Sequence, residues 1–249
     1  MNKVAPITLS FWIIKICATT LGETAGDLLS MTLNIGYGIS SVILISLFLV
    51  SVVIQLKASR FHPAPYWTVI LATSTAGTTM SDFMDRTLDL GYAKGSLLLI
   101  TLLLIILTIW RLSEKSLLVS NIHNVKAELF YWTAILLSNT LGTALGDYLA
   151  DDSGLGFLGG TALIASLLAL TALAFYFSKI SHVLLFWIAF ILTRPFGATF
   201  SDLLTKPADK GGLNFGTIGS SAVLASIVVI LVLYTTVMGK RSANTPART

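Results

Sequence analysis

Long apolar segments alternate with short polar connections along the whole chain. Each segment has about twenty residues, the length of helix that crosses a hydrocarbon core about 30 Å thick. The strict alternation of apolar and polar residues that is typical of a membrane-spanning strand is absent. We therefore predict an all-α integral membrane protein with eight transmembrane helices. The predicted spans are residues 9–28, 39–56, 66–85, 95–112, 129–149, 157–177, 183–204 and 215–238.

The composition excludes an ordinary soluble globular protein. Of the 249 residues, 55% are hydrophobic and 11% are charged, and the mean hydropathy is +0.84. The net charge of +4 is spread over short connections and a tail, so we expect a lipid bilayer as partner and no nucleic acid. The single cysteine, Cys17, excludes a disulfide within the chain.

The distribution of Lys and Arg predicts the orientation. The connections on the side that holds both termini carry ten of these residues, and the opposite connections carry four. Because basic residues are retained on the cytoplasmic side of short loops, we expect both termini in the cytoplasm. The polar segment 240–249, which contains Pro246, is predicted to be a disordered tail.

A motif recurs four times and divides the chain into four two-helix repeats, at about 9–56, 64–112, 129–178 and 183–238. An aromatic residue followed by tryptophan opens each repeat: Phe11-Trp12, Tyr66-Trp67, Tyr131-Trp132 and Phe186-Trp187. Ten residues after each tryptophan stands a glycine: Gly22, Gly77, Gly142 and Gly197. Fifteen residues after it stands an aspartate, preceded by Gly or Ser: Asp27, Asp82, Asp147 and Asp202. Such small residues let helices pack closely in lipid or break locally. A cleaved signal peptide is not expected, since the first segment carries this shared motif.

A second glycine, nine residues after the aspartate in three repeats, indicates the turn into the even-numbered helix. These glycines are Gly36, Gly91 and Gly156. The fourth repeat departs from the pattern, because it has an insertion at residues 206–210 and its matching Gly216 comes fourteen residues after Asp202.

Polar residues form a stripe on each odd-numbered helix, at the positions seven, eleven and fifteen residues after the tryptophan. In order, the four stripes are Thr19, Glu23, Asp27; Ser74, Thr78, Asp82; Asn139, Thr143, Asp147; and Arg194, Ala198, Asp202. Residues four apart share a helix face, and charged residues in a membrane face the bundle interior. We expect four parallel repeats whose odd helices enclose a polar pathway. Lys15, three residues after Trp12, is expected to extend to the cytoplasmic interface.

These motifs resemble a family of uncharacterised bacterial membrane-anchored proteins that contain four tandem repeats of unknown function, each with two transmembrane segments and a characteristic tryptophan. The resemblance extends from Phe11 to about Tyr234. It implies the eight-helix repeat fold and the bacterial inner membrane, and it implies no substrate.

The stripe favours a secondary active transporter. Carboxylate, hydroxyl and amide oxygens suit a hard divalent cation such as manganese or magnesium, and the stripe contains no Cys or His. We expect Glu23, Asp27, Asp82, Asp147 and Asp202 to bind the exported metal in exchange for protons. Arg194 is expected to pair with Asp202 or a neighbouring carboxylate. No cofactor is expected apart from the metal as cargo.

Other interpretations stay open at this point. Four similar helices can enclose a cation channel, although Glu23, Arg194 and Ala198 break the equivalence of a simple selectivity ring. The aspartates, about 22 Å from the tryptophans along the helix, can be merely hydrated or can cap a turn. A structural or enzymatic membrane protein is a third class. An enzyme is not expected, because no HExxH or nucleophile motif occurs. A homodimer is an alternative to a complete pathway in one chain.

Overall fold

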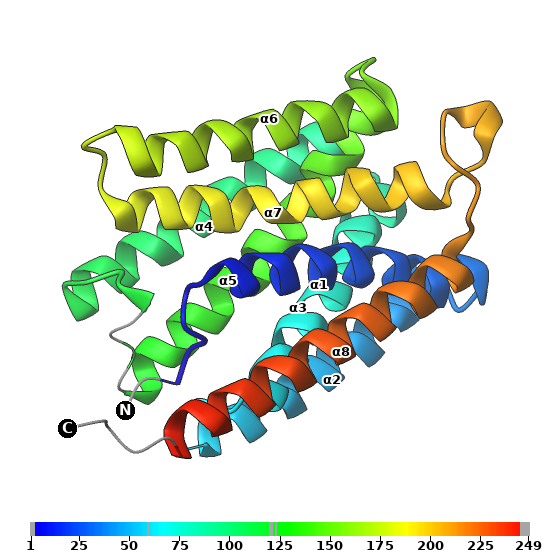
Figure 1. Cartoon of the computed structure of the whole chain (residues 1–249). Helices are drawn as coiled ribbons and strands as arrows, with labels where there is room; N and C mark the ends of the chain where they lie inside the picture. Colours follow the sequence, from blue (N-terminus) through cyan, green and yellow to red (C-terminus); the bar gives the residue numbers. More distant parts are fainter. Residues whose placement is uncertain (1–2, 59, 120–121, 123, 245–249) are drawn as a thin grey trace.

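The chain folds into eight α-helices joined by short connections (Figure 1). The computed structural model describes residues 3–58, 60–119, 122 and 124–244, and in these ranges it has no β-strand. The helices are α1 (Leu9–Asp27), α2 (Tyr37–Lys57), α3 (Pro63–Asp82), α4 (Tyr92–Glu114), α5 (Val125–Asp147), α6 (Gly156–Phe177), α7 (His182–Thr205) and α8 (Thr217–Asn244). Each predicted span corresponds to one of them.

The four odd-numbered helices form a closed inner ring. Helix α1 packs against α3, α3 against α5, α5 against α7, and α7 against α1. The even-numbered helices lie outside this ring, where α2 packs on α3, α4 on α5, α6 on α7, and α8 on α1. Each even helix therefore covers the odd helix of the next repeat, and the last repeat covers the first.

The odd helices are parallel, as the repeat predicted. Ring contacts bring the tryptophan motifs together: the Trp67 and Phe11 ring centroids lie 5.6 Å apart, and those of Trp12 and Phe186 lie 5.8 Å apart. We call this end of the ring the Trp end, and the opposite end, which holds the four motif aspartates, the Asp end. The start of α1 and the last turns of α8 both lie at the Trp end (Figure 1).

The motif glycines set the closeness of the ring. A Cβ atom on Gly77 would lie 2.9 Å from the backbone nitrogen of Thr140, and one on Gly197 would lie 2.8 Å from the carbonyl carbon of Thr19. Gly22 and Gly142 meet the next odd helix at Ser74 and Arg194 in the same way. The sequence left open whether these glycines allow close packing or a local break of the helix. The structure shows close packing, and the helices continue through the glycines.

The second set of glycines turns the chain between helices. Gly36, Gly91, Gly156 and Gly216 all have positive φ, between 66° and 82°. This backbone conformation is strained for a residue with a Cβ atom, so the structure confirms the predicted turns.

Two features of the helix ends differ from the simple repeat. In the first three repeats the aspartate is followed at once by a π-helical turn: Leu28–Thr32, Phe83–Thr87 and Tyr148–Asp152. Helix α8 extends to Asn244, so residues 240–244, predicted to be disordered, are helical. The helix meets no breaker before Pro246. Residues 245–249 lie outside the described residues.

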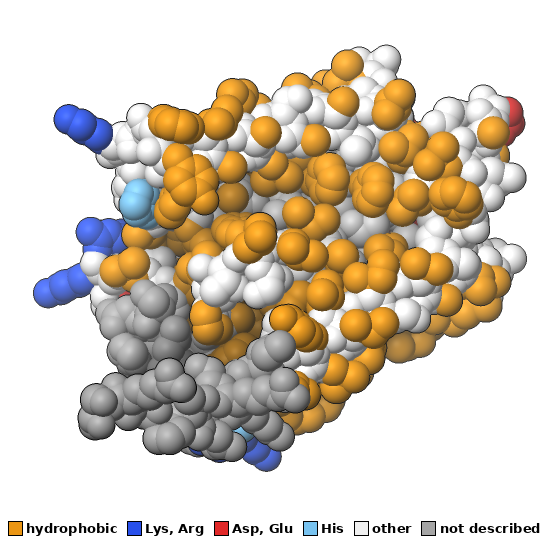
Figure 2. All heavy atoms as spheres, viewed as in Figure 1, with side chains coloured by type: hydrophobic (Ala, Val, Ile, Leu, Met, Phe, Trp, Pro, Cys, Tyr) orange, Lys and Arg blue, Asp and Glu red, His pale blue; other side chains and the backbone are white. Residues whose placement is uncertain are grey.

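The outer helices present apolar side chains to the surroundings. Exposed residues of α2 include Ile39, Val42, Leu47 and Val50, and apolar side chains cover the visible flank of the molecule between its two ends (Figure 2). By length and composition, five helices are suited to cross a membrane: α2, α4, α6, α7 and α8. Helices α1, α3 and α5 contain most of the polar stripe, and with α7 they form the inner ring.

Candidate functional site

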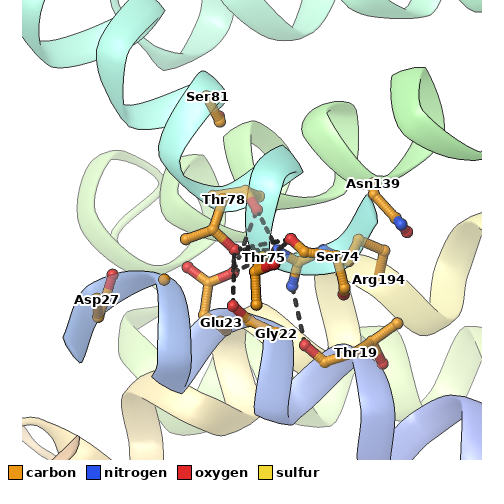
Figure 3. A network of polar contacts seen from close by, with 12 residues as sticks. Thr19, Gly22, Glu23, Asp27, Ser74, Thr75, Thr78, Ser81, Asn139 and Arg194 are labelled. Atoms are coloured by element: carbon orange, nitrogen blue, oxygen red, sulfur yellow. Dashed lines mark hydrogen bonds and ion pairs between the residues drawn. The ribbon is translucent and has the colours of Figure 1, made fainter. Parts of the chain in front are cut away.

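An ion pair between Glu23 and Arg194 occupies the middle of the ring. The Arg194 Nη2 atom lies 2.8 Å from the Glu23 Oε2 atom, and the two side chains are 0% and 3% exposed. The pair joins α1 to α7 (Figure 3). The sequence predicted that Arg194 would pair with Asp202 or a neighbouring carboxylate, and the observed partner is Glu23.

All four odd helices contribute to this central pair. Thr78 of α3 and Thr143 of α5 donate their hydroxyls to Glu23 Oε2, over 3.2 Å and 3.1 Å. Arg194 donates to the Thr78 and Thr143 hydroxyls and to the backbone carbonyls of Thr19 and Ser74. Two charges buried so deeply are tolerated only when the partner and further hydrogen bonds replace lost water. The guanidinium group therefore joins α7 to all three other odd helices at this level.

Two cationic side chains bridge the four motif aspartates at the Asp end. Lys206 Nζ lies 3.2 Å from an Asp202 oxygen and 3.3 Å from an Asp27 oxygen, which links α7 to α1. Arg86 lies 3.1 Å from Asp82 and 3.0 Å from Asp147, which links α3 to α5. The aspartates are between 2% and 5% exposed, so they are buried and paired rather than hydrated.

Both bridges follow one rule. Each cation stands four residues after the aspartate of its own repeat and also reaches the aspartate of the next repeat around the ring. The predicted spans end at residues 85 and 204, which leaves Arg86 and Lys206 in the connections and outside the predicted site. The spacing of four from Asp82 and Asp202 was the available signal, because such pairs are neighbours on a helix.

The environment keeps Lys206 charged. Burial disfavours the ammonium form, but the nearby Asp202 and Asp27 carboxylates outweigh this effect and raise the pKa of Lys206 above its ordinary value. The Lys206 ammonium that bridges α7 and α1 is therefore charged at physiological pH.

The structure gathers some predicted site residues and separates others. Thr78 and Thr143 meet the central pair through their hydroxyls, and Thr19 and Ser74 meet it through their backbone carbonyls. Asn139 instead donates to the Thr73 hydroxyl, over 2.9 Å, and Ala198 packs against Gly146. Among the described residues, no three His, Cys, Asp or Glu side chains converge closely enough to hold a metal ion. In this conformation the predicted metal ligands are thus divided between the central pair and the two bridges.

Aromatic side chains and one lysine fill the Trp end. The Tyr66 and Tyr131 hydroxyls lie 2.7 Å apart, and Phe11 contacts Trp67 and Phe186. Lys15 was expected to extend to the interface, but the structure buries it completely, at 0% exposure. Its position one turn inside the aromatic layer directs it into the ring.

The fold and site define a helical repeat protein of membrane character, with a buried charged axis. Four segments of the chain, residues 10–61, 65–116, 130–181 and 185–241, match the family model described as Repeat of Unknown Function (DUF347). The chain belongs to this family, as its motifs indicated. No curated protein and no solved structure matches the chain.

Proposed function

We propose that this protein is a proton-coupled exporter of a divalent cation, such as manganese or magnesium, in the bacterial inner membrane. In this proposal all eight helices cross the bilayer, and the Trp end with both termini faces the cytoplasm. The apolar outer helices and the Lys and Arg side chains that gather at the Trp end support this placement (Figure 2).

The balance of buried charges carries the proposal. The axis of the ring contains five carboxylates, on Glu23, Asp27, Asp82, Asp147 and Asp202. They are paired with three cationic groups, on Arg194, Arg86 and Lys206. Five negative charges against three positive ones leave two negative charges, which either two protons or one divalent cation would neutralise. Neutrality is favoured because an uncompensated charge in a poorly solvated interior costs several kcal/mol.

The Asp end offers oxygen ligands for such a cation. The Asp82 Oδ2 atom is buried and accepts no hydrogen bond from the described residues, so it has unused coordinating capacity. Carboxylate oxygens are preferred ligands of magnesium and manganese. A bound cation would compete with Lys206 and Arg86 for the aspartates, and the bridges would have to open for three ligands to converge.

A carrier is better supported than a continuous pore. Arg194 fills the ring at mid-height and contacts all three other odd helices, so passage requires this layer to rearrange. Such a rearrangement at each turnover is the behaviour of a transporter with alternating access.

The test is flux through liposomes that contain only the purified protein. Manganese and magnesium uptake would be followed with an internal indicator under an imposed pH gradient. We expect the parent protein to transport at least one of these ions, and we expect Glu23→Gln and the four Asp→Asn variants at the motif aspartates each to lower the rate about tenfold or more. Asp209→Asn, at an exposed carboxylate in the Asp-end connection, is the matched control and should transport like the parent.

Two results would reject the proposal. One is a parent protein that moves no divalent cation under either direction of the pH gradient. The other is parent-like transport by all five carboxamide variants, provided that they are folded, because the carboxylates would then be structural.

A further inference from the structure

Lys15 is a buried cationic side chain that the site described above does not use. It is 0% exposed, and its Nζ atom makes no hydrogen bond with the described residues. Its one marked contact is with the face of the Phe190 ring, whose centroid lies 4.1 Å from Nζ. By contrast, each of the other three cationic groups of the ring contacts at least one carboxylate.

The groups known to act on the Lys15 ammonium are an aromatic ring and a group of like charge. The equivalent positions of the other repeats hold Ile70, Ile135 and Phe190, all fully buried. The group that acts on Lys15 electrostatically from α7 is Arg194, another cation. The face of an aromatic ring offsets only part of the cost of burying an ammonium group.

The other packed elements bring no counter-charge. Tyr66 on α3 and Tyr131 on α5 are neutral phenols bonded to each other, and Glu128 of α5 pairs with Lys3. Residues 217–237 of α8 include no Asp, Glu, Lys or Arg. A primary amine in such a place is stable when neutral. It gains a proton only when the other buried groups of the ring carry an excess of negative charge.

We infer that Lys15 carries one of the two protons exchanged for each divalent cation. This inference rests on the proposed function and specifies its stoichiometry. With a cation bound, five ionised carboxylates, three paired cationic groups, the divalent ion and a neutral Lys15 amine sum to zero. After the cation leaves, one proton on a carboxylate and one on the Lys15 nitrogen restore zero. Each proton is taken from water on one side of the membrane and returned to water on the other.

The experiment measures the proton-to-metal stoichiometry and its dependence on membrane potential. Manganese flux into liposomes would be recorded at a fixed pH gradient while a potassium gradient with valinomycin sets the potential. We expect about two protons per manganese ion in the parent, and flux that does not respond to potential, because the exchange is electroneutral.

Two variants remove the titratable amine, and they differ in polarity. Lys15→Met retains the length of the side chain without a polar group, and Lys15→Gln retains a hydrogen-bonding group. Both should halve the stoichiometry to about one and make the flux sensitive to potential. Lys126→Met, at an exposed Trp-end lysine, is the matched control and should behave like the parent.

Each outcome has a definite meaning. Variants that still exchange two protons without a response to potential overturn this inference and leave the proposed function standing. A parent flux that responds to potential also overturns this inference and leaves the proposed function standing, because the exchange of two protons for one divalent cation is then not electroneutral. A parent that transports no manganese or other divalent ion rejects both, since a proton carrier then has nothing to couple. Thermal stability equal to or above that of the parent in Lys15→Met would separate the transport role from a structural one.

Discussion

At the residue scale, the molecule is organised by charges that are paired across helices as well as along them. The sequence predicted that the stripe residues face the ring interior, because a stripe with a spacing of four cannot face lipid. It did not predict the partners. Arg194 could reach several carboxylates, and only the packing of α7 against α1 selects Glu23. Arg86 and Lys206 resembled loop charges because they follow the helices that they help to join.

The central ion pair gives the largest expected stability effect. Glu23→Gln leaves the Arg194 guanidinium buried without its counter-charge, so we expect a loss of about 3–5 kcal/mol in the free energy of unfolding. The double variant Glu23→Leu with Arg194→Met removes both charges and should recover most of this loss. Denaturant unfolding in detergent measures both. Equal destabilisation by the single and double variants would show that the pair is not coupled.

The Lys206 bridge should act as a competitor of the cargo. Lys206→Met frees Asp27 and Asp202, so we expect tighter manganese binding, about tenfold, measured by titration calorimetry. The exposed Lys210→Met is the control. Unchanged affinity in Lys206→Met would contradict this role.

The pH dependence of that bridge has a definite sign. Because the pKa of Lys206 is raised, its contribution to stability is fully present below the unfolded value of about 10.4 and is lost as the pH rises through the folded value. The stability difference between the parent and Lys206→Met should therefore not fall as the pH rises from about 7 to about 9. Thermal unfolding across this range checks it, and a difference that vanishes by pH 8 would contradict it.

At the element scale, the helices and turns followed from the sequence, and their ends were less predictable. The positive-φ glycines mark the starts of the even helices because side-chain sterics leave few alternatives. The π-helical turns after Asp27, Asp82 and Asp147 have no sequence signature in the motif. They depend on how each helix end packs against its neighbours, which a single repeat does not specify.

Close packing of the odd helices can be tested with a pair of glycines. In Gly197→Ala the new methyl group overlaps the Thr19 backbone of α1, so we expect a loss of about 1–3 kcal/mol. Gly219→Ala on α8 has no neighbour within 4 Å and should be neutral or slightly stabilising. Thermal unfolding of the two variants in the same detergent makes the comparison. Equal effects would mean that the ring tolerates extra volume at this contact.

At the scale of the whole molecule, the repeats predicted parallel units but not their order of contact. Four similar units can form a ring in which each outer helix covers its own repeat or the next one. The structure shows the second arrangement, because α2 packs on α3 and α8 packs on α1. The similarity between repeats predicts the fold of each two-helix repeat. Which odd helix each even helix covers depends instead on how side chains of neighbouring repeats pack together.

The proposed orientation is open to a labelling test. In a Cys17→Ser background, a cysteine in place of Lys126 lies at the Trp end, and one in place of Lys210 lies in the Asp-end connection. We expect an impermeant maleimide to label the second and not the first in spheroplasts, because the Trp end faces the cytoplasm. Both should react after the membrane is opened. The reverse pattern in intact spheroplasts would invert the topology.

The closure of the ring by α7 on α1, and the covering of α1 by α8, have a consequence for biogenesis. Helix α1, which contains Lys15, Glu23 and Asp27, leaves the ribosome well before its ring neighbour α7 and its outer cover α8. At about 5–20 residues per second, the Glu23 carboxylate waits on the order of ten seconds for Arg194 to be made. Throughout that interval the nascent α1 must be sheltered by the insertion machinery, by water or by the partly assembled ring.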